Sequence, residues 1–321
     1  MKSLSAKSLR AANASRARQA TRRVALFTLL LLSCTVTALA AECPGNPKAI
    51  STSRTLVVDP REHPRVGIFQ YQETLPLADR EVVLTFDDGP MPPHTAHILD
   101  LLASNCVKAT FFVVGRMAKS SPELLRRAYN DGHTIGTHSE NHPMNMAAMP
   151  VEKAEREIEA GIASVTSALG GNATAPFFRF PGFERSDAVE QYLEAQGIMV
   201  WSADIVVGDW ELISPDRVVE RTMAQLNRAG RGIVLLHDIH GRTARALPKL
   251  LDRLKLAGFR VVHVEPAAAD RPKTETSAAE WAAPPGKRWT FQPGTSRGVL
   301  HPPKQAQRNL FWWLGRGWQG F

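Results

Sequence analysis

Two adjacent carboxylates, Asp87 and Asp88, end a short apolar run and are followed by Gly-Pro. Two ionised carboxylates this close repel each other unless a cation or a basic side chain compensates their charge. The pair therefore suggests metal binding or acid–base chemistry. The structural alternative is a turn in which one Asp caps the following helix, and an Asp-Asp-Gly sequence alone would usually be that.

Two histidines four residues apart, His138 and His142, follow another apolar run. On one face of a helical turn, such a pair can bind a single ion. With Asp88 they would supply two imidazoles and one carboxylate, which leaves positions open for water and substrate, as in catalytic metal sites. The three cysteines of the chain are widely spaced, so any metal here must use His and carboxylate ligands.

Further polar side chains follow other apolar runs. Arg179 stands in Phe-Arg-Phe-Pro-Gly and needs an anionic partner, for which Asp87 is the candidate. If that ion pair lay on the surface, it would contribute little to the stability of the fold. His237 ends the apolar run 233–236, and by itself would more readily be a core histidine with satisfied hydrogen bonds. Three more candidates lie between these two positions: Asp204, Asp209 and Trp210.

An alternation of short apolar runs and segments of helical period could bring these side chains together. The expected strands are residues 82–86, 109–114, 134–137, 177–180, 199–202, 233–236 and 260–264. The expected helices lie near residues 95–105, 121–131, 151–169, 186–197, 215–229 and 243–257. This order predicts an α/β fold with a parallel sheet, either a closed barrel or an open doubly wound sheet. Both architectures place sites at the carboxyl ends of the strands, so the candidates are expected to converge.

Five segments carry the polar candidates: those at residues 87–88, 138–142, 179, 204–210 and 237. In this order, they resemble the polysaccharide deacetylase family, also called the NodB homology domain or carbohydrate esterase family 4. The resemblance covers roughly residues 81–264. It implies a distorted (β/α) barrel of about seven parallel strands. It also implies hydrolysis of N-acetyl groups on N-acetylhexosamine poly- or oligosaccharides, such as chitooligosaccharides or peptidoglycan, with release of acetate.

The resemblance assigns a role to each candidate on the metal side of the site. Asp87 would be the general base, and Arg179 would orient it. Asp88, His138 and His142 would hold one divalent ion. Zinc is the expected metal, and cobalt, nickel or manganese could replace it.

The resemblance also implies a general acid, His237, tuned by a carboxylate. We expect Asp209 rather than Asp204 to be that carboxylate, because a tryptophan follows it. Gly182 stands where many members carry an aromatic residue, but its backbone N–H could still stabilise an oxyanion. His240 is expected to lie in a loop without a role. The implied substrate-binding residues are Pro181, Gly182, Trp210 and Leu235.

Three functional classes fit the sequence. The first is the N-acetylsugar deacetylase, and the second is a related metal-dependent amide or cyclic-imide hydrolase that acts on a non-sugar substrate. The third is a non-catalytic glycan-binding module, which the presence of both Asp87 and His237 disfavours because binding needs neither an acid nor a base. An open groove with exposed aromatic side chains would favour the first class, and a capped small pocket would favour the second.

The net charge of +8 is unevenly distributed along the 321 residues. Residues 1–41 carry seven Lys/Arg and no acidic residue, whereas residues 42–266 carry 24 Lys/Arg against 28 acidic residues. The expected folded part has no basic excess, so we expect a glycan partner and no nucleic acid. The sequence does not predict the oligomeric state.

Residues 1–41 have the layout of an export signal: a positive region with Arg16, Arg18, Arg22 and Arg23, then an apolar run at 24–36 and a small-x-small pattern at Ala38-Leu39-Ala40. The run is short for crossing a bilayer. We therefore expect cleavage and release to the periplasm or the extracellular space rather than membrane anchoring. Cleavage would leave Cys43 and Cys106, which could form a disulfide in an oxidising compartment.

Two segments flank the expected catalytic domain at residues 81–266. Residues 42–80 contain five prolines and are expected to be an irregular linker and lead-in. Residues 267–321 are rich in Pro, Trp and basic residues and are expected to form a flexible tail. The aromatic residues near its end could touch a membrane surface or the cell wall.

Overall fold

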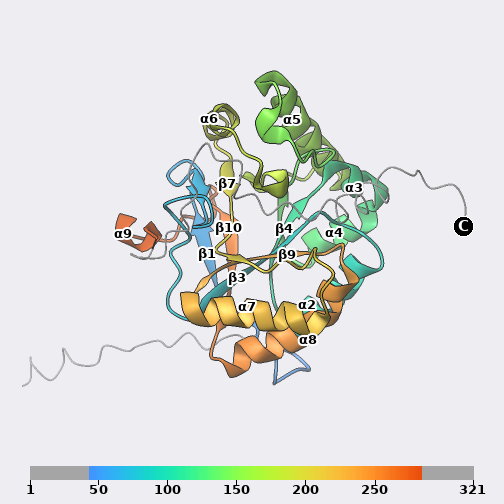
Figure 1. The fold of residues 1–321 in the computed structure, drawn as a ribbon, viewed down its shortest axis with the longest axis vertical. Coiled ribbons are helices and arrows are strands. Elements are labelled where there is room, and N and C mark those ends of the chain that lie inside the picture. Colours follow the sequence, from blue (N-terminus) through green and yellow to red (C-terminus); the bar gives the residue numbers. More distant parts are fainter. Residues whose placement is uncertain (1–42, 284–321) are drawn as a thin grey trace, which may run out of the picture. The chain divides into compact units, whose positions relative to one another are not determined.

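Parallel strands surrounded by helices make up the fold (Figure 1). The computed structural model describes residues 43–283, so the expected export signal and most of the expected tail lie outside the described residues. The ten strands of this part are β1 (Thr52–Val58), β2 (Arg65–Val66), β3 (Glu81–Asp87), β4 (Thr110–Val113), β5 (Thr134–Thr137), β6 (Phe177–Phe178), β7 (Met199–Trp201), β8 (Ile205–Val206), β9 (Gly232–His237) and β10 (Arg260–Pro266). The α-helices here are α2 (His94–Ser104), α3 (Gly115–Ser120), α4 (Pro122–Asn130), α5 (Val151–Ala168), α6 (Asp187–Ala195), α7 (Pro215–Ala229), α8 (Gly241–Leu256) and α9 (Ala278–Trp281).

The strand order is that of a distorted barrel rather than a flat sheet. Hydrogen-bonded neighbours run β1-β10-β3-β4-β5-β6-β7-β2, and β9 pairs with both β3 and β8. Strand β3 therefore lies between β4 and β9, and its first residues also pair with β10. Every one of these pairs is parallel. The predicted α/β fold with parallel strands is confirmed.

Alternate residues of β3 face opposite sides, because side chains along a strand alternate. Val82, Leu84 and Phe86 pack in the cluster that also contains the buried faces of α2, α7 and α8. Val83 packs in a second cluster with side chains of β7, β9 and β10. Asp87 has the parity of Val83, so the alternation that builds the core also directs this carboxylate away from the helices.

Helix α7 illustrates how local signals set the elements. Ser214 caps its first turn by accepting a hydrogen bond from Arg217 N at 3.2 Å, and Pro215 follows at the first helical position. Gly230 ends the helix in the left-handed region, with φ of 80°. All seven expected strands and all six expected helices are present, with most ends displaced by one or two residues.

The expectation of an irregular lead-in is wrong for β1. This strand pairs in parallel with β10, from Thr52↔Val261 to Val58↔Pro266. Only its last residues are buried, so its sequence lacks the long apolar run that marks the other strands. β2, β8 and α3 were not expected either, because each is too short for a clear period.

The expectation of a flexible tail is wrong for residues 267–283. Thr274 N donates to Val57 O at 2.9 Å, which ties this segment to β1. Trp281 in α9 is buried and stacks on His63, with ring centroids 3.5 Å apart. The sheet and the docked segment thus extend beyond residues 81–266 on both sides, while residues 284–321 lie outside the described part.

Cys43 and Cys106 form a disulfide with a Cα–Cα distance of 5.6 Å. It joins the start of the described chain to the turn after α2, across a sequence separation of 63 residues. Within residues 43–283, no helix has the length and apolar character that crossing a membrane requires.

Candidate active site

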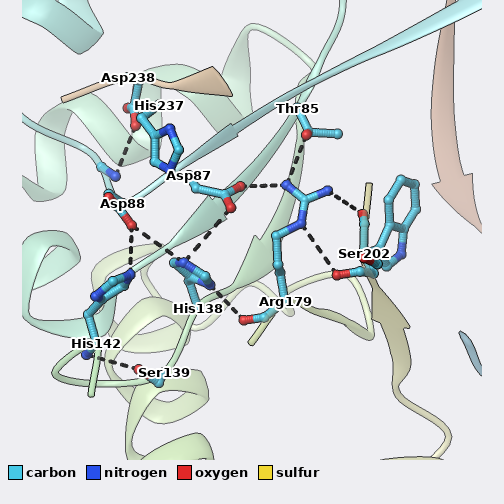
Figure 2. Close-up of polar contacts among 12 residues, drawn as sticks. Thr85, Asp87, Asp88, His138, Ser139, His142, Arg179, Ser202, His237 and Asp238 are labelled. Carbon is cyan, nitrogen blue, oxygen red and sulfur yellow. Dashed lines mark hydrogen bonds and ion pairs between the residues drawn. The ribbon is translucent and has the colours of Figure 1, made fainter. Parts of the chain in front are cut away.

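The polar candidates lie together at the carboxyl ends of the parallel strands (Figure 2). Asp87 ends β3 and is in register with His237, which ends the neighbouring β9. His138 directly follows β5, and Arg179 directly follows β6. The predicted convergence is confirmed, because the parallel sheet carries each side chain to the same edge.

Asp88, His138 and His142 form a potential metal site. The Oδ1 atom of Asp88 lies 3.1 Å from His142 Nε2 and 3.4 Å from His138 Nε2. One ligand atom from each of the three residues lies within 4.8 Å of the others. Figure 2 shows both imidazoles directed at the Asp88 carboxylate. Two imidazoles and one carboxylate are a donor set used for catalytic divalent ions.

The hydrogen bonds around His138 provide a test of whether this site fits a cation. His138 Nδ1 lies 2.6 Å from Arg179 O, and since a carbonyl can only accept, Nδ1 carries the proton. When the ring is neutral, Nε2 then presents its lone pair to Asp88 Oδ1, which is buried without a hydrogen bond among the described residues. Two acceptors facing each other repel, and a cation between them removes the repulsion. The residues present fit a bound metal ion.

The histidine loop has a different backbone from the expected helical turn. Ser139 and His142 have positive φ values of 63° and 57°, so residues 138–142 form a loop. His142 N donates to Ser139 Oγ at 3.0 Å, and Gly115 N at the start of α3 donates to Ser139 O at 2.9 Å. The expectation of a shared helical face is wrong, although the two imidazoles still converge.

Asp87 is a buried carboxylate paired with a buried arginine, as predicted. Its Oδ1 accepts from Arg179 Nη1 at 2.6 Å, and the two side chains are 3% and 1% exposed. Arg179 also donates to Thr85 Oγ1 and to Ser202 O, both at 2.9 Å, and its guanidinium lies over Phe112. The pair is therefore not a surface salt bridge: Arg179 is fixed from several sides and holds Asp87 in one orientation.

His237 is paired with Asp209, and Asp204 has another partner set. Asp209 Oδ1 lies 2.8 Å from His237 Nδ1, and Asp209 Oδ2 accepts from Thr243 Oγ1 at 2.6 Å. Burial alone would lower the pKa of His237, but the Asp209 carboxylate, with smaller contributions from Asp88 and Asp87, raises it to about 10. His237 is therefore held in its protonated form. Asp204 instead accepts hydrogen bonds from Ile68 N, Ile233 N and the Thr74 hydroxyl.

The expected substrate-binding residues surround this centre. Trp210 packs edge-on against His237, with ring centroids 5.4 Å apart. Leu235 is buried on β9 two residues before His237, so it points to the same side of the sheet. Pro181 is buried, whereas Gly182 is exposed and has a φ of 57°. A Cβ at Gly182 would lie 2.6 Å from Met144 Cε, which places this glycine beside the histidine loop.

Two residues near His237, Asp238 and His240, lie at the site although no role is predicted for them from the sequence. Asp238 is buried and accepts hydrogen bonds from Gly89 N and Thr95 Oγ1, and burial raises its pKa to about 7. His240 has its ring centroid 5.7 Å from that of His237, and burial and the His237 charge lower its pKa to about 4. A carboxylate next to a strand-terminal histidine was the available signal for Asp238.

Comparisons with known proteins find deacetylases that are similar to this chain. The sequence profile described as polysaccharide deacetylase matches residues 75–201. A chitooligosaccharide deacetylase of Rhizobium leguminosarum bv. trifolii is 37% identical over 183 residues, which cover 57% of this chain and 80% of that protein. A peptidoglycan-N-acetylglucosamine deacetylase of Bacillus cereus is 33% identical over 200 residues, which cover 60% of this chain and 70% of that protein. The solved structure of the Bdellovibrio bacteriovorus peptidoglycan deacetylase Bd3279 has a TM-score of 0.60 at 33% identity, over 68% of this chain and 60% of that chain.

Proposed function

Since the chain belongs to the polysaccharide deacetylase family, we propose that it is a metal-dependent hydrolase that removes N-acetyl groups from N-acetylhexosamine units of a poly- or oligosaccharide. Acetate is the released product. The observation that carries this proposal is the presence, at one edge of the barrel, of a base, an acid and a three-residue donor set for a metal.

Asp87 is the general base. It accepts a proton from the attacking water, and the buried Arg179 guanidinium 2.6 Å away fixes the orientation of its carboxylate. Asp87 Oδ2 lies 3.8 Å from His138 Nε2, so Asp87 is next to the proposed metal ligands. It is not itself a member of the group of three ligands. A base beside the ion can act on the water that attacks the amide carbon.

His237 is the general acid. Asp209 accepts a hydrogen bond from Nδ1–H of His237, which leaves the protonated Nε2 free to donate to the departing sugar nitrogen. Without that proton the amine would leave as a poor, anionic leaving group. The raised pKa of His237 keeps the proton available at neutral pH. Acid–base hydrolysis of an amide requires one group that accepts a proton, here Asp87, and one that donates a proton, here His237.

Asp88, His138 and His142 would hold the metal. When bound, a divalent ion supplies Lewis acidity, which polarises the amide carbonyl and makes water more acidic. We propose zinc because it suits mixed His and carboxylate ligands, and cobalt, nickel or manganese could replace it. The exposed Gly182 would contribute its backbone N–H to the developing oxyanion.

The surroundings support a glycan substrate over a small cyclic imide. Trp210 is half-buried beside His237, and Gly182, next to the Met144 side chain, is exposed. Leu212, two residues after Trp210, is 86% exposed, so the loop after β8 carries an exposed apolar side chain close in sequence to the tryptophan that packs on His237. Such surface is suited to the apolar faces of sugar rings. Together with the named substrates of the relatives, it supports chitooligosaccharides or peptidoglycan as the substrate class.

We also propose that the protein is exported. The sequence of residues 1–41 has the layout of an export signal. The Cys43–Cys106 disulfide supports the same destination, because such bonds persist in oxidising compartments outside the cytosol.

Acetate release from a panel of substrates tests the proposed function. The panel should contain chitooligosaccharides, peptidoglycan and an N-acetylated non-sugar amide, each assayed with and without a chelator. We expect acetate from at least one glycan, loss of activity with the chelator and recovery with zinc. Turnover of the non-sugar amide alone would favour the second functional class, and an inactive metal-loaded protein that binds glycans would favour the third.

A further inference from the structure

Asp238 is a buried carboxylate that the proposed chemistry does not use. It directly follows His237, and its residue is 1% exposed. Its Oδ1 accepts a hydrogen bond from Gly89 N at 2.9 Å, and its Oδ2 accepts one from Thr95 Oγ1 at 2.6 Å. Figure 2 shows Asp238 on the opposite side of the Asp88 carboxylate from the two imidazoles. Both of its oxygens therefore accept hydrogen bonds from the segment that follows β3.

The turn after β3 is held at both of its ends by this arrangement. Gly89 N is the amide immediately after Asp88, and Asp238 fixes it directly. Thr95 Oγ1, which donates to Asp238, also accepts from Met91 N at 2.7 Å. In addition, Asp238 N donates to Asp87 O at 3.3 Å. The peptide units on both sides of Asp88 are therefore hydrogen-bonded to one residue, Asp238, which directly follows the neighbouring strand β9.

The fit between Asp238 and Gly89 is close. A Cβ atom on Gly89 would lie 1.9 Å from Asp238 Oδ2 and 2.4 Å from its Cγ, so only glycine allows the carboxylate to approach. This requirement comes from space, since the φ of Gly89 is not in the left-handed region.

Asp88 itself has a backbone conformation that needs support. Its φ is 81°, in the left-handed region that non-glycine residues rarely occupy and that costs about 1 kcal/mol or more. In this conformation its Oδ1 faces His138 Nε2 and His142 Nε2. If residue 88 relaxed to negative φ, the carboxylate would turn away from the two imidazoles.

We propose that Asp238 is a positioning residue for the metal site, which acts by holding the Gly89 amide and thereby the left-handed conformation of Asp88. The inference rests on the proposed function, because it takes Asp88 to be a metal ligand. It also joins the two halves of the site: the segment that carries the acid His237 fixes the turn that carries the base Asp87 and the ligand Asp88. Asp238 does not touch the ion or the substrate.

Zinc affinity of the full chain tests this inference. Asp238→Asn keeps the size of the side chain but replaces one acceptor oxygen by a donor, so it cannot accept from both Gly89 N and Thr95 Oγ1. We expect its zinc Kd, from competition with a chelator of known affinity, to be about 10–100-fold higher than that of the wild type. Asp204→Asn is the matched control, because Asp204 is also buried and holds backbone amides, but of residues 68 and 233. It is expected to lower thermal stability and leave the zinc Kd unchanged.

A second pair of variants keeps the test valid if Asp238→Asn does not fold. Thr95→Val removes the hydroxyl that links Asp238 to Met91 N, whereas Thr95→Ser retains it. Weaker zinc binding by Thr95→Val with near-normal binding by Thr95→Ser would support the inference. A folded Asp238→Asn or Thr95→Val protein with the wild-type zinc Kd would overturn it. Wild-type protein that binds no zinc would instead contradict the proposed function, so the two failures are distinguishable.

Discussion

At the residue scale, the site depends on pairs in which one group sets the orientation or the charge of the other. Arg179 orients Asp87, and Asp209 holds His237 protonated. The sequence predicted both pairs because each member follows a separate apolar run and the order of the runs resembles a known family. It did not predict the role of Asp238, which depends on the space above Gly89 and on a hydroxyl from α2. Spacing along the chain carries no information about such a fit.

Removing the Asp209 charge should lower the pKa of His237. The Asp209 carboxylate raises that pKa to about 10 despite burial, and the acid must be protonated to act. In Asp209→Asn, the alkaline limb of the kcat–pH profile should therefore move to lower pH, since His237 loses its proton earlier. A bound cation would lower both pKa values and leave the direction of the difference unchanged. Asp204→Asn is the control, because Asp204 makes no hydrogen bond to His237. An alkaline limb at the wild-type pH in Asp209→Asn would refute this assignment.

At the element scale, the long periodic segments were predictable and the short ones were not. Helices such as α7 carry a cap, a repeating apolar face and a terminating glycine, which agree with one another. Strand β1 has only two buried apolar residues and is defined by its partner β10. The i, i+4 spacing of the two histidines fits a helical turn and a loop equally well. The positive φ values of Ser139 and His142, which the spacing does not predict, make this segment a loop.

The close approach of α5 to the histidine loop gives a prediction at this scale. A Cβ on Gly161 would lie 2.5 Å from the carbonyl carbon of Ser139, so the helix packs directly on the loop backbone. Gly→Ala in a helix interior normally stabilises by about 0.5–1 kcal/mol. Here we expect Gly161→Ala to destabilise by about 1–3 kcal/mol through overpacking, and to weaken zinc binding by shifting His142.

Denaturant unfolding and chelator competition measure the two effects. Ser167→Ala, at an exposed position of α5, is the matched control and should leave both quantities near the wild-type values. A Gly161→Ala protein that is more stable than the wild type, with unchanged zinc affinity, would contradict this prediction. It would show that the histidine loop accommodates the added methyl group without moving His142 from the metal site.

At the scale of the whole molecule, the last described residues of the chain pack against its first strands. Residues 274–283 dock against β1 and the segment after β2: Thr74 N donates to Trp281 O at 2.9 Å, and Glu73 forms an antiparallel bridge with Ala282. These contacts join parts of the sequence about 200 residues apart. Composition suggested a tail from residue 267 onward, since no local pattern marks a segment whose order comes from distant partners.

Truncation at two positions tests this packing. A chain ending at residue 283 keeps Trp281 on His63, whereas a chain ending at residue 273 loses it. Since removing a large buried aromatic side chain costs about 3–5 kcal/mol, we expect a clearly lower Tm for the shorter chain. Trp281→Ala in the longer chain should reproduce most of that loss. Equal Tm values for the two truncated chains would show that residues 274–283 do not contribute to the fold.

In the proposed function, turnover depends on one cation bound by Asp88, His138 and His142, next to a base that is not a ligand. The most direct measurement is metal content per chain together with deacetylase rate, for chelator-stripped protein titrated with zinc. We predict that the rate rises in proportion to bound zinc up to one ion per chain, the number that a single three-residue site can hold. His142→Ala should lose both the metal and the rate, and Asp87→Asn should bind zinc but turn over about 10²–10⁴-fold more slowly. Full turnover by the metal-stripped wild type would show that no metal is needed, and an unchanged rate in Asp87→Asn would show that Asp87 is not the base.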